Sequence, residues 1–254
     1  IKTIVQTALA AGRDMLTELE AKAVLDACHI PVVPTQRVDA TPEAAAQAAE
    51  VMAQTMGYPV VLKILSDDIS HKSDVGGVAL NLQNEADVRT AATTMLERVL
   101  RERPQARIQG FTVQSMVRRK QAQELIVGST IDSVFGPIIL FGQGGTAVEV
   151  MADRAVALPP LNVPLAKALV SRTRVSKLLA GFRDTPAVDE AALYGVLVAV
   201  SQLLAEIPEI AELDINPLIV NFEGALALDA RIKLSAKAPA GAANFAIRPY
   251  PAHL

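Results

Sequence analysis

The chain has 254 residues and a formal net charge of −3 at pH 7, from 24 lysines and arginines against 27 aspartates and glutamates. This length suffices for one large or two smaller domains with a buried core. The weak negative charge, without a long basic block, disfavours broad nucleic-acid binding, which needs clustered cations. No stretch approaches the roughly 18 consecutive apolar residues of a spanning helix, and we expect neither a secretory leader nor a membrane partner.

The cysteine content favours a cytoplasmic location. Cys28 is the single cysteine, which excludes an internal disulfide and is typical of a reducing cytosol. Ala23, Val24 and Ala27 surround it in a helical pattern, which favours a small core residue over a reactive thiol. The chain begins with Ile1 instead of methionine, so we expect a piece excised from a longer protein.

Capping signals and hydrophobic periodicity define the first half of the chain. Thr17 with Glu20 three positions later forms a capping box, which predicts a helix over 18–28. Thr41 before Pro42 predicts a second, Ala-rich helix that ends near Gly57. The other elements predicted here are a short strand over 36–38, a strand over 59–65, a polar loop over 66–75, a strand over 77–83 and a helix over 85–102 capped by Asn84.

Strands become more frequent from residue 108 onward. The pattern predicts strands over 108–117 and 123–131, a short strand over 137–141, helices over 164–180 and 189–207, and a hairpin of strands over 213–220 and 225–233. Because strands and helices mix in both halves, we predict an α/β (α+β) fold. We expect a smaller lobe over 15–115, a larger lobe over 116–235 and an Ala- and Pro-rich linker over 236–254.

Lys63 lies inside the apolar run of residues 58–65. Burying an unpaired ammonium group is costly, so this lysine must lie at a sheet edge or meet a negative charge. An edge lysine that only prevents aggregation is the alternative to a functional role.

The segment that follows, residues 70–78, combines His71, Lys72 and Ser73 with the pair Gly76-Gly77. Adjacent glycines let backbone N–H groups come close to a phosphate, and Lys72 and Ser73 can add donors. His71 is one of three histidines in the chain, and an imidazole nitrogen is a competent nucleophile for a phosphoryl group. An ordinary turn with a solvated histidine is the alternative.

The last predicted hairpin provides a geometric argument for a cation site. If residues 221–224 form its loop, position 220 pairs with 225, and Asn216 lies directly across from Asp229 with Cβ atoms roughly 4.5–5.5 Å apart. Asp214 precedes Asn216 by two residues and shares its face. Their oxygens are the ligand type that Mg²⁺ prefers. A solvated polar face is the alternative, and a one-residue bulge would break the register.

Two further features sit near predicted strands. The loop Gly142-Gln143-Gly144-Gly145 directly follows an apolar strand, so its backbone is expected to come close to another group. A strained turn is the alternative there. Glu124, beside the strand over 113–117, is a candidate acceptor of hydrogen bonds from a ribose.

Taken in chain order, these motifs resemble the ATP-grasp domain of the NDP-forming acyl-CoA synthetases, the superfamily that also contains the nucleotide-binding subunit of succinyl-CoA synthetase. The resemblance covers about residues 15–235. It is carried by residues 16–22, 57–63, 70–78, 135–137, 141–145, 158–161 and 213–218.

The resemblance implies an ATP-grasp fold of two lobes, with ATP or ADP between them. The phosphate contacts that it implies come from Lys63, His71, Lys72, Ser73, Gly76 and Gly77. The adenine-hinge and ribose contacts that it implies come from Gln114, Val117 and Glu124. The Mg²⁺ ligands that it implies are Asn216 and Asp229, and the catalytic residues that it implies are His71, which relays phosphate, and Asp214, near a phosphohistidine.

The tail carries a second resemblance. Residues 245–251 are similar to the junction in protein lysine acetyltransferases, where a synthetase-like region precedes a GNAT-type acetyltransferase domain. This resemblance implies a chain excised from such a protein, with a GNAT-type domain as its C-terminal partner.

Two functions follow from these resemblances. The first is the nucleotide-binding part of an acid–CoA ligase (ADP-forming), which exchanges phosphate with a histidine within acyl-CoA + ADP + Pi ⇌ carboxylic acid + CoA + ATP. Its partners would be CoA-binding and ligase domains that carry their own phosphohistidine. The second is a non-catalytic regulatory module that senses nucleotide or acyl-CoA. His71, Asp214 and Asn216 favour the first, because a sensor needs neither a phosphate relay nor metal ligands.

Overall fold

The computed structural model describes residues 1–69, 72–145 and 153–236. They divide into two compact units, Val33–Arg118 and Ile1–Val32 together with the described residues from Arg119 onward. Each unit has a hydrophobic core of its own. Within the described residues, no helix is long and apolar enough to cross a membrane.

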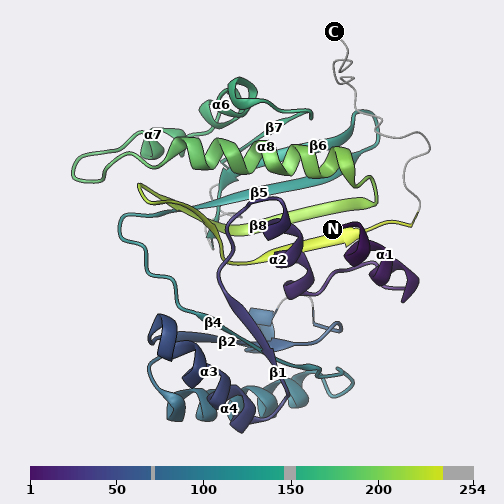
Figure 1. Ribbon diagram of the computed structural model, residues 1–254, viewed down its shortest axis with the longest axis vertical. Coiled ribbons are helices and arrows are strands. Elements are labelled where there is room, and N and C mark those ends of the chain that lie inside the picture. The colour runs from purple at the N-terminus through teal and green to yellow at the C-terminus, as the bar shows by residue number, and fades with distance from the viewer. Residues whose placement is uncertain (70–71, 146–152, 237–254) are drawn as a thin grey trace. The chain divides into compact units, whose positions relative to one another are not determined.

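The unit Val33–Arg118 is an antiparallel four-stranded sheet with two helices on one face. Its strands, in spatial order, are β1 (Thr35–Val38), β4 (Gly110–Ser115), β2 (Val60–Leu65) and β3 (Val78–Leu82). Figure 1 shows α3 (Pro42–Met56) and α4 (Glu85–Glu102) beside each other along this sheet. The core between sheet and helices contains Leu62, Ile64, Phe111 and Val113 from the strands and Ala45, Ala49, Val88, Ala92 and Met95 from the helices.

The caps of these helices confirm the sequence prediction. The Thr41 side chain accepts a hydrogen bond from the N–H of Ala44, with Pro42 at the first helical position. Asn84 accepts one from Asp87. These side chains satisfy N–H groups that have no partner inside the helix, which fixes where each helix begins.

The second unit contains a six-stranded antiparallel sheet. Its path is β10 (Ala230–Leu234), β8 (Ile210–Asn221), β5 (Gln123–Asp132), β6 (Gly136–Gln143) and β7 (Arg154–Ala157), and β9 (Gly224–Ala227) also pairs with β8. The helix α8 (Glu190–Glu206) lies beside this sheet and runs in roughly the same direction as β5 and β8 (Figure 1). Leu193, Leu197, Val200 and Leu204 recur along it at helical spacing and are buried in the core of this unit.

The helix α2 (Glu18–Ala27), which was expected in the smaller lobe, belongs to the unit of the six-stranded sheet. Its capping box between Thr17 and Glu20 is confirmed, but its buried face of Ala21, Val24 and Leu25 joins the larger core. Residues 15–32 were predicted to belong to the smaller lobe, but they belong to the unit with the six-stranded sheet. The first element of the four-stranded unit is β1.

Two further local predictions differ from the structure, and two elements were not predicted. The helix predicted over 164–180 is two helices, α6 (Val163–Ser171) and α7 (Ser176–Leu179). The reason is Asp153, whose carboxylate accepts hydrogen bonds from the backbone N–H groups of Arg174 and Val175. These two residues directly precede α7, so a new helix begins there. The predicted strand over 225–233 is interrupted between β9 and β10. The pattern also missed α1 (Lys2–Ala10) and β7.

Candidate functional site

Lys63 occupies an interior strand of the four-stranded sheet. It pairs with Thr112 on β4 and with Val78 on β3, so the edge-strand alternative is wrong. Its flanking residues Leu62 and Ile64 face the helices, which places Lys63 on the opposite face of the sheet, because side chains alternate along a strand. The lysine is only 6% exposed.

Buried polar side chains of β4 lie beside Lys63 on this face. Thr112 and Gln114 alternate with core residues Phe111 and Val113 along β4, so both lie on the face of Lys63. Thr112 is 0% and Gln114 is 4% exposed. The structure thus brings two of the predicted nucleotide contacts, Lys63 and Gln114, onto one sheet face and adds Thr112, which the sequence prediction omitted.

Val117 lies just after β4 and is half-buried. One boundary between the two units falls one residue later, between Arg118 and Arg119. The predicted adenine hinge, 114–117, therefore includes the last residues of β4 and the start of the irregular segment that leads out of this unit.

The loop between β2 and β3 differs from the expectation in how it uses its glycines. Residues Lys72–Val75 form a short 3₁₀ helix. The N–H of Gly76 donates to the carbonyl of Ser73 at 3.1 Å, and the N–H of Gly77 donates to the carbonyl of Lys72 at 2.7 Å. In this structure the two N–H groups therefore stabilise the turn and are not free for a phosphate. His71 lies outside the described residues.

Packing explains why both positions are glycine. A Cβ on Gly77 would lie 2.5 Å from the Ile64 side chain, and one on Gly76, where φ is +67°, would lie 2.7 Å from the Arg98 side chain. Half-buried Lys72 and exposed Ser73 remain as the side-chain donors of the loop. The glycines therefore determine the shape of the loop, and the donor roles of Lys72 and Ser73 stay predictions.

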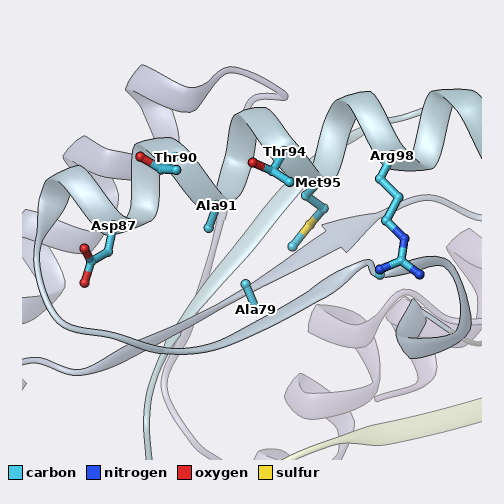
Figure 2. Close-up of a pocket in the computed structure, with 8 residues that line it drawn as sticks. Ala79, Asp87, Thr90, Ala91, Thr94, Met95 and Arg98 are labelled. Carbon is cyan, nitrogen blue, oxygen red and sulfur yellow. The ribbon is translucent and has the colours of Figure 1, made fainter.

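A hollow of about 420 Å³ lies behind this loop, between β3 and α4. Figure 2 shows Asp87 and Arg98 at opposite ends of the α4 side chains that line it, with Ala79 of β3 beneath them. Ala79 pairs with Leu62, which faces the helices. The hollow is thus on the helix side of the sheet, away from Lys63, and is not the predicted phosphate site.

The predicted hairpin register is confirmed on both sides of the proposed metal pair. Residues 218–221 of β8 pair with 227–224 of β9, and the register resumes with Ile215 opposite Ala230 and Asp214 opposite Arg231. Asn216 and Asp229 fall in the gap between these two ladders, at positions that the same register places opposite each other. The turn is shorter than expected, because Asn221 and Gly224 are themselves paired.

Burial and two charged neighbours act on the pKa of Asp214 in opposite directions. Burial raises its pKa above the ordinary value, the Arg231 guanidinium lowers it, and the negative charge of Asp229 raises it again. Asp214 precedes Asn216 by two residues and so shares its face of β8, and the register places Asp229 opposite Asn216. Two carboxylates and the amide of Asn216 thus share one patch.

This donor set fits a hard divalent cation. Mg²⁺ binds through one or two carboxylates and completes its shell with water and phosphate oxygens. The described residues contain no group of three or more His, Cys, Asp or Glu that could hold a metal by themselves. Asp229 and Asn216 are therefore suited to hold Mg²⁺ together with a phosphate.

The glycine loop after β6 connects Glu124 with Asn216. The N–H of Gly145 donates to Asn216 Oδ1 at 3.0 Å, and a Cβ on Gly145 would lie 1.9 Å from Glu124 Oε2. The N–H of Gly144 donates to the carbonyl of Glu124 at 2.8 Å. The loop was expected to come close to another group, and that group is the strand β5. The loop thus contacts both the exposed Glu124 and the candidate metal ligand Asn216.

We expect Asp214→Asn to stabilise the fold near neutral pH. The folded-state pKa of Asp214 is raised, so the ionised carboxylate disfavours the folded state above that pKa, and the cost disappears when both states are protonated at low pH. Urea unfolding should show a gain at neutral pH that shrinks as the pH falls toward the unfolded value of 3.8. Asp132→Asn is the opposite-sign control, because N–H groups of Phe135 and Val134 lower the pKa of Asp132. A loss of stability in Asp214→Asn at neutral pH would contradict the assignment.

The family model for the ATP-grasp domain matches residues 7–234. The chain belongs to the ATP-grasp family. Within it, the chain is 36% identical over 233 residues to the beta subunit of acetate–CoA ligase [ADP-forming] I of Pyrococcus furiosus, covering 92% of this chain and 97% of that subunit. The predicted mixed α/β ATP-grasp fold is confirmed, and the chain is an ATP-grasp module of the ADP-forming acyl-CoA synthetase type.

Some ATP-grasp relatives of this chain are much longer. Acetate–CoA ligase [ADP-forming] I of Archaeoglobus fulgidus is 38% identical over 214 residues, which cover 83% of this chain but 31% of that protein. The ATP-grasp module thus occurs both as a separate subunit and as about one third of a longer chain.

Solved structures agree with this ATP-grasp assignment. The dinucleotide-forming acetyl-coenzyme A synthetase 1 of Ca. Korarchaeum cryptofilum, in complex with coenzyme A, Ca-AMPCP and HgCl⁺, matches with a TM-score of 0.85 and 37% identity over 92% of this chain and 99% of that chain. Another structure of that synthetase contains coenzyme A and Mg-AMPPCP, with its phosphohistidine segment pointing towards the nucleotide binding site; its TM-score is 0.77, with 35% identity over 92% and 99% of the two chains.

Proposed function

We propose that this ATP-grasp module binds ATP or ADP with Mg²⁺ and transfers phosphate between the nucleotide and a phosphohistidine. The overall reaction would be acyl-CoA + ADP + Pi ⇌ carboxylic acid + CoA + ATP. The observation that carries this proposal is the buried Lys63 beside Thr112 and Gln114 on one sheet face of an ATP-grasp domain. The similarity to ADP-forming acetate–CoA ligases supports it.

The residues of the chain divide the chemistry between two places. Lys63 neutralises negative charge on the phosphates, with Lys72 and Ser73 as further donors of the loop. Gln114 and Val117 line the adenine side, Glu124 accepts from the ribose, and His71 relays phosphate. These assignments rest on the resemblance, on the shared face of Lys63 and Gln114, and on the contact of Glu124 with the glycine loop.

The metal side is formed by the hairpin. Asn216 and Asp229 would hold Mg²⁺, which offsets charge on the transferring phosphoryl group when bound. Asp214, two residues from Asn216, would lie near the phosphohistidine. Burial raises the pKa of Asp214, against the lowering effect of Arg231 and with a smaller contribution from the like charge of Asp229, so Asp214 can hold a proton more readily than an ordinary aspartate.

The partners follow from the length of the relatives. We propose that CoA-binding and ligase domains carrying the phosphohistidine act with this chain, from the same polypeptide or a separate subunit, since the chain matches 31% of the longer ligase.

A following GNAT-type domain is a further proposal, carried only by residues 245–251, which lie outside the described residues. A cytoplasmic location is proposed from the single cysteine. The relatives give the regulatory alternative no support.

Calorimetric titration with ATP and ADP, with and without Mg²⁺, tests the proposed function. We expect Mg²⁺ to strengthen nucleotide binding to the wild-type chain. In Asp229→Ala the increase in affinity caused by Mg²⁺ should be about tenfold smaller or more, because the substitution removes a charged metal ligand. Asp26→Ala, an exposed carboxylate on α2, is the control and should bind as the wild type does. Equal Mg²⁺ dependence in Asp229→Ala would remove Asp229 from the metal site. A folded wild-type chain without nucleotide affinity would refute the proposed function.

A further inference from the structure

Thr112 is a buried hydroxyl group without a hydrogen-bond partner among the described residues. Its side chain is 0% exposed, and Thr112 Oγ1 makes no hydrogen bond there. Most buried polar atoms in folded proteins are paired, so each exception calls for a physical reason. The unmet bond disfavours the folded state, and a valine of the same shape would avoid that cost.

The position of Thr112 in the sheet supplies that reason. It lies directly across from Lys63 on β2 and from Arg37 on β1. Directly opposed residues of antiparallel strands place their side chains on the same face, with Cβ atoms roughly 4.5–5.5 Å apart. The hydroxyl thus lies between two cationic side chains, on the face away from α3 and α4. A cationic row of this kind favours an anionic ligand.

The loop glycines strengthen this argument. Since the N–H groups of Gly76 and Gly77 donate to carbonyls of their own turn, they are not free to bind a phosphate in this structure. This leaves side chains as the donors beside Lys63 that the register identifies, and Thr112 is the buried hydroxyl closest in register to Lys63.

We propose that Thr112 is a further nucleotide-contacting residue, whose hydroxyl group donates a hydrogen bond to a phosphoryl oxygen beside Lys63. This inference rests on the proposed function and extends it by one contact. Bound nucleotide would satisfy the hydroxyl, so the cost of the unmet bond falls on the nucleotide-free state only. Removal of the hydroxyl group should therefore stabilise the nucleotide-free protein and destabilise the nucleotide-bound protein.

Thr112→Val tests the proposal because it replaces the hydroxyl with a methyl group of the same shape. We expect a higher melting temperature without nucleotide, about tenfold weaker binding of ATP and ADP by calorimetry, and a smaller nucleotide-induced rise in melting temperature. Thr112→Ser, which keeps a hydroxyl, should recover most of the affinity. If Thr112→Val does not fold, Thr112→Ala against Thr112→Ser gives the same comparison.

Ser129→Ala is the matched control. Ser129 is also buried with an unpaired hydroxyl among the described residues, but it lies on β5 in the other unit, on the side of the core residue Val127. It should leave nucleotide affinity unchanged. Unchanged affinity in folded Thr112→Val would overturn the inference, provided that Lys63→Met loses binding. If neither variant loses binding, it is the proposed function that fails.

Discussion

Lys63→Met should weaken ATP and ADP binding about a hundredfold or more while the protein stays folded. A charge-assisted hydrogen bond contributes about 1.5–3 kcal/mol, and a lysine among phosphate oxygens makes more than one. Methionine keeps the unbranched stem that packs within β2 but removes the ammonium group. Calorimetry measures the affinity, and thermal unfolding monitors the fold.

The control for this experiment is Lys233→Met. Lys233 is a lysine on β10 whose ammonium group is 3.2 Å from Glu212 at the surface. It has the same chemistry and also lies on a strand, yet it should leave nucleotide affinity within the error of the measurement. Affinity like that of the wild type in a folded Lys63→Met protein would remove the basis of the nucleotide site.

Gly144→Ala should destabilise the fold by about 2–3 kcal/mol, a fall in melting temperature of about 5–10 °C. A Cβ at this position would lie 2.4 Å from the backbone carbon and oxygen of Leu125. These atoms belong to the central strand β5, and the N–H of Gly144 is bound to the neighbouring carbonyl of Glu124. The methyl group can be accommodated only if the loop moves away, which would also displace Gly145 from Asn216.

Gly195→Ala is the opposite control in the same unit. Gly195 lies within α8, and a Cβ there would have no heavy atom within 4 Å apart from its chain neighbours and the nearby backbone of the helix itself. Alanine in a helix interior is about 0.5–1 kcal/mol more stable than glycine, so this variant should melt at a higher temperature. A Gly144→Ala protein with wild-type stability and nucleotide affinity would show that the loop does not need its close approach to β5.

The hairpin shows how far a sequence can specify a site. Alternating apolar residues on both sides of a short turn fix the register, so the sequence alone places Asn216 across from Asp229. The same holds for the caps of α3 and α4, where the cap and the first turn are neighbours in sequence. Interactions of this kind are local, and the residues that form them can be read together.

The parts that could not be predicted depend on contacts between distant segments. The break between α6 and α7 follows from Asp153, more than twenty residues from the N–H of Val175 that it accepts. The position of α2 follows from its packing in the larger core. The residues next to Thr112 in the sequence predict only that it lies in a strand. The pairing of β4 with β2 is what places it beside Lys63.

The pairing of β1 with β4 also governs how the chain is assembled. Thr35, near the start of the Val33–Arg118 unit, lies opposite Gln114, near its end. The chain thus enters and leaves this unit along adjacent strands, the arrangement of an inserted domain whose ends are close together. Residues 33–118 therefore form a unit that can be exchanged for the corresponding unit of a related protein. They can also be deleted and replaced by a short linker, because the two chain ends that the linker must connect lie on paired strands.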